Sequence, residues 1–156
     1  MKIRRACEKD IPRIDALLSQ VLEIHASIRP DIFVSGTRKY TDEELKTILA
    51  DENTPVFAAV DENDEMLGYA FCILHDYSGS NNLQPIRSLY IDDLCVDKEA
   101  RGMHVGKALY DYVMNYATEL GCHSVTLNVW EGNDSARALY EKMGFGIQKT
   151  VMEKIM

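Results

Sequence analysis

The sequence lacks the features that mark secretion, membrane insertion and metal binding. No apolar run approaches the length of a membrane span, and the basic start MKIRRACEKD is not followed by the apolar core of a secretory signal. The four cysteines are scattered, with no C-x-x-C pair and no histidine cluster nearby, so we expect reduced, mostly buried thiols and no metal. These absences favour a cytoplasmic protein.

Positive charge is also scarce. The chain carries 17 Lys and Arg against 25 Asp and Glu, a net charge of −8, which argues against nucleic acid as the main partner. The same charge mildly favours a cationic substrate. With 156 residues, 46% hydrophobic and 27% charged, the chain is long enough for one buried core. We expect a single domain over residues 1–156, with no repeat or linker.

One stretch, Leu89 to Ala108, has the pattern of a strand that feeds a helix through a glycine-bearing loop. Apolar residues up to Val96 alternate around the acidic pair Asp92 and Asp93, and a helical period begins near His104. The pattern predicts that Val105, Leu109, Tyr112, Tyr116 and Leu120 share one helix face. Free backbone N–H groups at such a helix start, together with the helix dipole, favour an anion, usually phosphate.

The spacing within this loop excludes two common phosphate-binding motifs. A Walker-type loop needs Gly five residues before Gly106 and Ser or Thr after Lys107, where this chain has Arg101 and Ala108. The dinucleotide pattern Gly-x-Gly-x-x-Gly is absent as well. An NTPase and a dinucleotide-binding protein are therefore rejected.

The remaining elements follow from hydrophobic periodicity and from capping and turn residues. Asp10 is the expected N-cap of the first helix, and Thr41 to Glu44 form a capping box that opens the second. Strands are expected at Lys2–Cys7, Pro55–Val60, Met66–Asp76, from Ile86 to Val96, at Ser124–Trp130 and at Ile147–Ile155, with a last helix capped by Asn133. This order, β-αα-βββ-α-β-α-β, predicts an α/β fold: a mixed sheet with helices on both faces.

Two motifs resemble those of the GNAT family of N-acetyltransferases. Residues Arg101 to Gly106 resemble its R/Q-x-x-G-x-G/A pyrophosphate loop, although His104 stands where the family usually has Gly. The pattern N-x-x-A-x-x-x-Y-x-x-x-G-F is met in full by Asn133, Ala136, Tyr140, Gly144 and Phe145. The element order also agrees with the GNAT fold, although before Met66 the resemblance is one of element order only.

The resemblance implies that acetyl-CoA lies in a cleft where the strands ending near Val96 and Val129 splay apart. The pantetheine arm would pair with backbone groups of Leu94 to Val96, and the pyrophosphate would rest on the loop amides. The cofactor-binding candidates are Leu94, Cys95, Val96, Arg101, Gly102, Met103, His104, Val105, Gly106, Lys107, Asn133, Ala136 and Tyr140. Arg101 and Lys107 also suit plain helix-terminus roles, and Asn133 that of a helix cap.

The catalytic candidates are Asp92 and Tyr140. Alkylammonium groups have a pKa of about 10, so a base must take a proton from the acceptor amine; Asp92 is the first candidate, with Asp93 expected to face the opposite way. Tyr140 matches the general acid of the family, although it also suits a core tyrosine. A backbone N–H near Cys95 or Val96 would meet the oxyanion, and Cys95 itself is expected to be a packing residue.

The resemblance therefore implies an acyltransferase that moves an acetyl group from acetyl-CoA directly to a primary amine in a ternary complex. The alternatives are a catalytically degenerate CoA-binding sensor or interaction module of the same fold, and an unrelated α/β binding module. The acceptor stays open between a protein N-terminus, a lysine, a polyamine and an aminoglycoside. His25, Arg29 and Phe33 either line its entrance or only cover the core. We expect neither nucleic acid nor membrane as a partner. The oligomeric state stays open, with a homodimer as one option.

Overall fold

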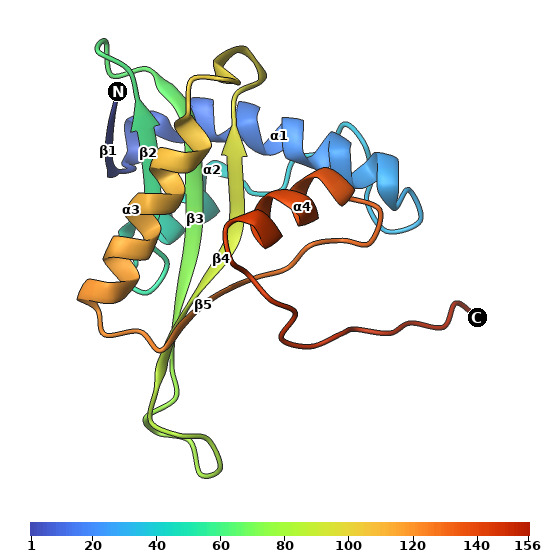
Figure 1. The fold of residues 1–156 in the computed structure, drawn as a ribbon. Coiled ribbons are helices and arrows are strands. Elements are labelled where there is room, and N and C mark those ends of the chain that lie inside the picture. The colour runs from blue at the N-terminus through green and yellow to red at the C-terminus, as the bar shows by residue number, and fades with distance from the viewer.

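The computed structural model describes residues 1–156, which form a five-stranded sheet in the order β1-β2-β3-β4-β5 (Figure 1). Antiparallel pairing joins the first four strands in sequence, and β4 and β5 are parallel. The strands are β1 (Lys2–Arg5), β2 (Val56–Val60), β3 (Met66–Asp76), β4 (Arg87–Val96) and β5 (Ser124–Leu127). The predicted mixed sheet is confirmed.

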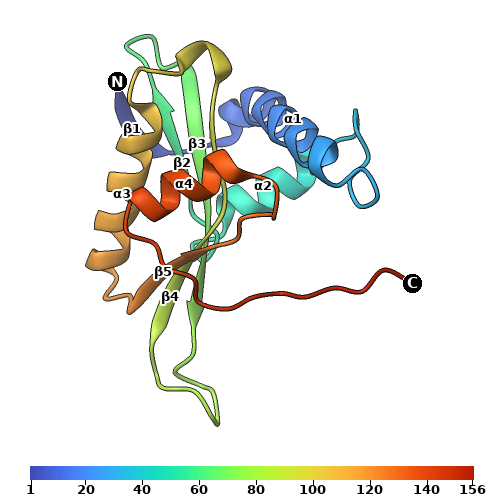
Figure 2. The ribbon, with the colours of Figure 1, turned by 45° about the vertical axis from the view of Figure 1, so that its right-hand side comes forward.

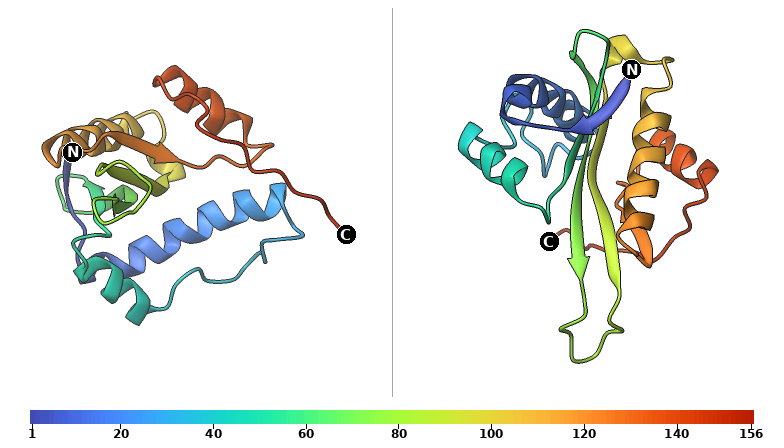
Figure 3. Two further views of the ribbon diagram at one scale, coloured as in Figure 1. Left: turned by 90° about the horizontal axis from the view of Figure 1, so that it is seen from below. Right: turned by 90° about the vertical axis from the view of Figure 1, so that its left-hand side faces the viewer.

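Helices cover both faces of this sheet, as Figures 2 and 3 show. Helices α1 (Ile11–Ile28) and α2 (Asp42–Ala50) lie on one face, and α3 (Val105–Glu119) lies on the other. Helix α4 (Asp134–Lys142) lies on the α3 side, across from α1. Two short 3-10 turns, η1 (Glu8–Asp10) and η2 (Lys98–Ala100), precede α1 and α3.

Each face of the sheet has its own hydrophobic core. Under α1 and α2, the core includes Leu17, Leu45 and Tyr69; under α3 it includes Phe57, Leu89 and Leu109, all essentially inaccessible to solvent. Helix α3 buries Val105, Leu109, Val113 and Ala117, a four-residue spacing. The predicted α3 face was partly wrong, because Tyr112 is 37% exposed and contacts Phe57 from the flank of the helix, 5.0 Å between ring centroids.

The two N-terminal helices begin differently. The predicted capping box of α2 is confirmed: the Thr41 hydroxyl accepts from the Glu44 N–H, and the Glu44 carboxylate accepts from the Thr41 N–H. Asp10 is the N-cap residue of α1, as predicted, but its side chain makes no hydrogen bond to the start of that helix. Its carboxylate instead accepts from the Cys7 N–H at 2.8 Å and from the Arg4 guanidinium, because the preceding turn places a charged partner within its reach.

Two irregularities interrupt the pairing of the sheet. The β2–β3 register shifts next to Gly68, where a Cβ atom would lie 2.6 Å from the Cys95 carbonyl oxygen. A bulge and a close backbone packing thus coincide at Gly68, two features typical of glycine within a strand. In the β3–β4 pair, Phe71 faces Asp93 and Cys72 faces Ile91, so Asp92 is an extra residue without a partner.

Strand β5 is shorter than expected. It ends at Leu127, whereas the alternating pattern predicted a strand as far as Trp130. Its parallel pairing with β4 stops at Ile91 opposite Leu127, and the chain then turns away toward α4. The last part of β4, from Asp92 to Val96, therefore has no neighbouring strand on that side.

The predicted final strand, Ile147–Ile155, is absent. Residues 143–156 carry no regular secondary structure, and the chain runs out past the sheet to its C-terminus (Figure 1). Alternating apolar residues form a strand only where a sheet edge offers partners, and β5 contributes only four residues. Instead, Glu153 pairs with Arg29 near the end of α1.

No helix in the protein combines the length and the apolar character required to cross a membrane.

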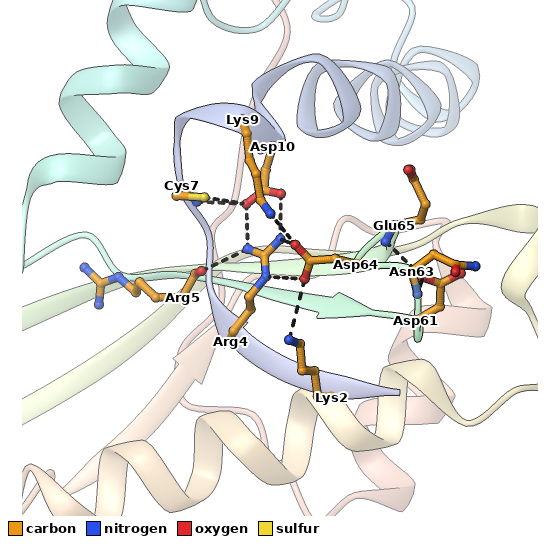
Figure 4. A network of polar contacts seen from close by, with 10 residues as sticks. All are labelled: Lys2, Arg4, Arg5, Cys7, Lys9, Asp10, Asp61, Asn63, Asp64 and Glu65. Atoms are coloured by element: carbon orange, nitrogen blue, oxygen red, sulfur yellow. Dashed lines mark hydrogen bonds and ion pairs between the residues drawn. The ribbon is translucent and has the colours of Figure 1, made fainter.

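A charge network fastens β1 to the start of α1 and to the β2–β3 turn (Figure 4). The Arg4 guanidinium donates to both carboxylate oxygens of Asp10, at 2.7 and 2.9 Å, and its Nε donates to Asp64 at 2.9 Å. Lys2 and Lys9 also pair with Asp64. Asp10 is only 5% exposed, so its charge depends on Arg4.

Arg4→Met should therefore destabilise the fold, by about 3 kcal/mol or more, because it leaves the buried Asp10 carboxylate without its partner. Burial opposes the ionisation of Asp10, yet Arg4 and the Cys7 N–H lower its pKa overall. A lowered carboxyl pKa stabilises above the unfolded value, near 4, and this contribution disappears as the pH falls through the folded value. Urea unfolding should show a large deficit at pH 7 that shrinks toward pH 3. Arg38→Met, which breaks solvent-exposed pairs, is the control and should change little.

Candidate active site

The free edge of β4 presents backbone groups toward the gap left by β5. The Asp97 N–H donates to the Leu67 carbonyl at 2.8 Å, which sets the alternation along this antiparallel pair. The N–H and C=O groups of Asp93 and Cys95 thus face β3, and those of Leu94 and Val96 face the open side. Of the residues predicted to pair with an extended ligand, Leu94 and Val96 meet the geometry and Cys95 does not.

The loop before α3 offers a second set of unpaired groups. The amides of Gly102, His104, Val105, Gly106 and Lys107 donate to no acceptor within the chain. Gly102 has a φ of 84° and His104 a φ of 60°, so His104 adopts the left-handed conformation expected of the family's glycine. Several N–H groups and the positive end of the α3 dipole converge here, which is the arrangement that binds phosphate.

An ion pair that sequence reasoning missed holds this loop in place. The Asp97 carboxylate accepts from the Glu99 N–H at 3.1 Å and pairs with Arg13 of α1, and Asp97 is only 6% exposed. Arg13 also donates to the Met66 carbonyl at 3.1 Å. The capping role of Asp97 is readable from its place before a turn, but its pairing with Arg13 joins residues 84 positions apart and leaves no local signal.

The two basic side chains of the loop differ in whether they already have a partner. Lys107 pairs with Asp111 one turn further along α3, which favours its plain helix-surface role. Arg101 makes no ion pair and no hydrogen bond, and Met103 is 55% exposed. At Gly106 an added Cβ would lie 3.5 Å from Val96 Cγ2, so this residue lies next to the Val96 side chain at ordinary contact distance.

Helix α4 carries the residues of the second motif. Asn133 caps the helix, with its side-chain oxygen accepting from the Ala136 N–H at 3.4 Å, as predicted for its structural role. Its side-chain NH₂ group donates to no protein atom. Ala136 and Tyr140 are half-buried on the same side of α4, one turn apart.

Tyr140 is held by aromatic contacts and keeps its hydroxyl free. Its ring packs edge-to-face on Phe145 at 5.7 Å, and Phe145 also contacts Tyr110, whose hydroxyl donates to the Met143 carbonyl. The Tyr140 hydroxyl makes no hydrogen bond within the chain. Burial, and then the negative charge of Asp93, raise the pKa of Tyr140 above its usual value, so the phenol stays protonated at neutral pH.

Asp93 is the more strongly perturbed member of the acidic pair. The Tyr69 hydroxyl donates to its carboxylate at 2.9 Å, and Tyr69 is fully buried in the core beneath α1. Burial raises the pKa of Asp93 to about 6, although Lys39 and the Tyr69 hydroxyl oppose the shift. A carboxyl group with this pKa exchanges protons near neutral pH, which is the property of a general base.

The expectation that Asp92 and Asp93 face opposite ways was wrong. The bulge at Asp92 breaks the two-residue alternation, and both carboxylates lie near the ammonium of Lys39. Lys39 Nζ is 3.2 Å from the Asp92 carboxylate. Sequence reasoning missed Lys39 and Tyr69, because a bulge and a contact across 53 positions leave no periodic pattern.

The segment between α1 and α2 meets the loop after β5 through aromatic rings. His25 contacts Phe33 at 5.2 Å, and Phe33 lies edge-on to Trp130 at 5.5 Å. The Arg29 guanidinium lies 5.6 Å from the Trp130 ring centroid and pairs with Asp31 and Glu153. These contacts agree with the covering role predicted for His25, Arg29 and Phe33, and they place the three residues beside the loop that leads to α4.

Cys95 is a packing residue, as expected. It is 7% exposed in the core under α1, and burial raises the pKa of its thiol to about 12, which makes it a poor nucleophile. No group of three or more His, Cys, Asp and Glu side chains in the chain is arranged to hold a metal ion.

Comparison with known proteins identifies the family of this chain. A sequence model of the acetyltransferase (GNAT) family matches residues 18–145. The peptidyl-lysine N-acetyltransferase YjaB of Escherichia coli (strain K12) is 28% identical over 120 residues, spanning 73% of this chain and 69% of that protein. A mycothiol acetyltransferase of Paenarthrobacter aurescens (strain TC1) is 34% identical over 87 residues, which cover 56% of this chain but only 26% of that protein.

A solved structure confirms the fold over the full length. The crystal structure of the tetramutant of the BH1408 protein from Bacillus halodurans superposes with a TM-score of 0.93 at 28% identity, covering all of both chains. The chain therefore belongs to the GNAT family of acetyltransferases, whose members use acetyl-CoA as the acyl donor.

Substitutions at Gly106 should separate ligand approach from folding. Gly106→Ala adds a Cβ at ordinary contact distance and gains about 1 kcal/mol of helix propensity, so the fold should hold. Gly106→Val adds two methyl groups between the α3 start and Val96, and we expect acetyl-CoA affinity to fall at least about tenfold relative to Gly106→Ala. Calorimetric titration measures the affinity. Equal affinities in the two variants would show that this face of α3 does not meet the ligand.

Proposed function

We propose that this protein transfers the acetyl group of acetyl-CoA directly to a primary amine, within a ternary complex. One observation carries the proposal: the free edge of β4, the acidic pair and the unpaired amides before α3 follow one another along the stretch of chain where β5 has left β4, and the charge of Asp93 reaches Tyr140 of α4. The free edge and the amides suit the donor, and the acidic pair and Tyr140 supply and remove the protons that acyl transfer to an amine requires.

The donor suits the open edge and the loop. The alternating groups of Leu94 and Val96 match an extended amide chain, which would pair with them as an added strand. The loop amides from Gly102 to Lys107 would hold the pyrophosphate, with Arg101 as the free cation beside them. The Asn133 side-chain NH₂ group is left to donate to the pantetheine arm. Of the two predicted oxyanion donors, the Val96 N–H has the suitable direction.

The acceptor proposed is an alkylammonium group. Its charge suits the acidic pair, and one of the relatives is named for acetylating peptidyl lysine. Asp92, whose carboxylate already holds an ammonium group, would anchor the acceptor. Asp93, with a pKa of about 6, is then better suited than Asp92 to accept its proton, directly or through water. The neutral nitrogen attacks the thioester carbonyl carbon, and the carbon–sulfur bond breaks as the C–N bond is completed.

Tyr140 would return a proton to the departing thiolate. The negative charge of Asp93 is one cause of the raised Tyr140 pKa. When Asp93 takes the proton of the amine, this charge is neutralised and the pKa of Tyr140 falls. The phenol would thus become a stronger acid at the step in which it donates.

Direct transfer is favoured over an acyl-enzyme because no activated nucleophile lies at the gap. Cys95 is buried with a raised pKa, its sulfur faces the Leu17 carbonyl at 3.7 Å, and no histidine is hydrogen-bonded to it. A sensor that binds CoA without turnover is the alternative; the free Tyr140 hydroxyl and the perturbed Asp93 count against it.

A cytoplasmic location is part of the proposal. All four cysteines are free, and Cys7 is exposed, which suits a reducing compartment.

Tyr140→Phe tests the acid. The ring and its contact with Phe145 are kept, so stability should be nearly unchanged, whereas kcat should fall about 10²–10⁴-fold with little change in KM for acetyl-CoA. An acyl donor with a less basic thiolate should narrow the gap, because such a leaving group needs no immediate proton. Tyr110→Phe removes a hydroxyl that donates to the Met143 carbonyl; it is the matched control and should keep most of the activity. Normal turnover by Tyr140→Phe would return Tyr140 to a packing role.

Asp93→Asn and Asp92→Asn separate base from anchor. If Asp93 is the base, kcat/KM of the wild type should fall as the pH drops through about 6. Asp93→Asn should lose this acidic fall of kcat/KM together with most of kcat. Asp92→Asn should mainly raise KM for the amine and keep the acidic fall of kcat/KM. Steady-state rates from pH 5 to 9 measure both. If Asp92→Asn instead abolishes the acidic fall of kcat/KM and leaves KM unchanged, Asp92 is the base.

A further inference from the structure

A lysine ammonium already lies in the acceptor half of the site. Lys39 Nζ is 3.2 Å from the Asp92 carboxylate and 5.1 Å from the centroid of the Tyr40 ring. Asp93 also contributes to its electrostatic environment, and the Lys39 charge in turn lowers the pKa of His25. Two carboxylates and an aromatic face are the groups by which proteins recognise an alkylammonium ion.

The charges around Lys39 keep it protonated. Burial works against its positive charge, but the carboxylates of Asp92 and Asp93 outweigh burial and raise the pKa of Lys39 above its ordinary value. The uncharged groups nearby are the rings of Tyr40 and Tyr90, and His25 is neutral at pH 7 because burial and Lys39 lower its pKa. The position is therefore a built site for one monovalent cation.

No backbone hydrogen bond holds Lys39 in its position. The segment between α1 and α2 has no helix or strand from Arg29 to Thr41, and the backbone N–H and C=O of Lys39 make no hydrogen bond. The capping box of α2 starts two residues later, at Thr41. The Lys39 side chain can thus leave Asp92 without breaking a helix, a strand or a backbone hydrogen bond.

We propose that Lys39 is an internal stand-in for the acceptor: its ammonium occupies the subsite for the acceptor's ammonium, and the acceptor binds by displacing it. The inference rests on the proposed function for the identity of this half of the site. It narrows the acceptor to a primary amine on an unbranched alkyl chain, like that of Lys39 itself. The exchange replaces one cation by another, so the acidic pair is never left without a counter-charge, and a neutral ligand cannot compete.

The test uses n-butylammonium, which has the atoms of a lysine side chain from Cβ to Nζ. Lys39→Ala empties the subsite, so the variant should bind this ion at least about tenfold more tightly than the wild type, in which Lys39 fills the subsite most of the time. Lys39→Arg keeps a cation in place and should bind as weakly as the wild type. Titration followed by nuclear magnetic resonance in low salt measures the affinities, and n-butanol is the neutral control.

Several outcomes decide the inference. Tighter binding to Lys39→Ala that n-butanol does not reproduce, and that disappears when Asp92→Asn is added, supports it. Equal binding by wild type and variant, or equal binding of butanol, overturns it. Lys39→Gln keeps the length of the side chain without its charge; it serves if Lys39→Ala does not fold, and it should likewise bind more tightly than Lys39→Arg. The titration contains no acetyl-CoA, so a failure of acetyl transfer is a separate result that bears on the proposed function.

Discussion

The separation of β4 from β5 is the constraint on which the site depends. Pairing stops at Ile91 and Leu127, and the remaining backbone groups of β4 on that side have no strand beside them. Unpaired N–H and C=O groups inside a protein are costly unless water or a ligand satisfies them. In the function proposed above, a ligand extended along Leu94 and Val96 would complete the sheet. The loop before α3, anchored by the Asp97–Arg13 pair, places unpaired amides at the end of the same edge. Family membership and the local backbone geometry thus point to the same gap.

The bulge at Asp92 is the second determinant, because it brings two carboxylates to one side of the strand. In a regular strand, Asp92 and Asp93 would point to opposite faces, and only one would meet an acceptor. Here one carboxylate holds an ammonium ion and the other, buried beside Tyr69, has a pKa near neutrality. The same charge influences Tyr140, so the proposed base and acid are electrostatically linked although they lie on different elements.

Local patterns predicted most of the elements and both motifs. The capping box at Thr41 and the two strands β2 and β3 were each readable from a few neighbouring residues, because short-range sterics and hydrogen bonds decide them. The departures from local expectation share a different cause. Asp10 has the residue type of a helix cap but is held by Arg4, and the alternating residues 147–155 have no sheet edge to pair with. In each case a partner elsewhere in the chain decided the outcome, and local propensity did not.

The sequence by itself therefore determined the family and the order of the elements as far as α4, since these depend on contiguous motifs. The same motifs carry the residues that we propose for the donor and for the departing thiolate. Only the tertiary structure decided where β5 leaves β4, which way Asp93 faces and that Lys39 lies against Asp92. Each of these depends on pairing between residues far apart in the chain. A register shift of one residue reverses the direction of a side chain without changing the periodicity that sequence reasoning reads.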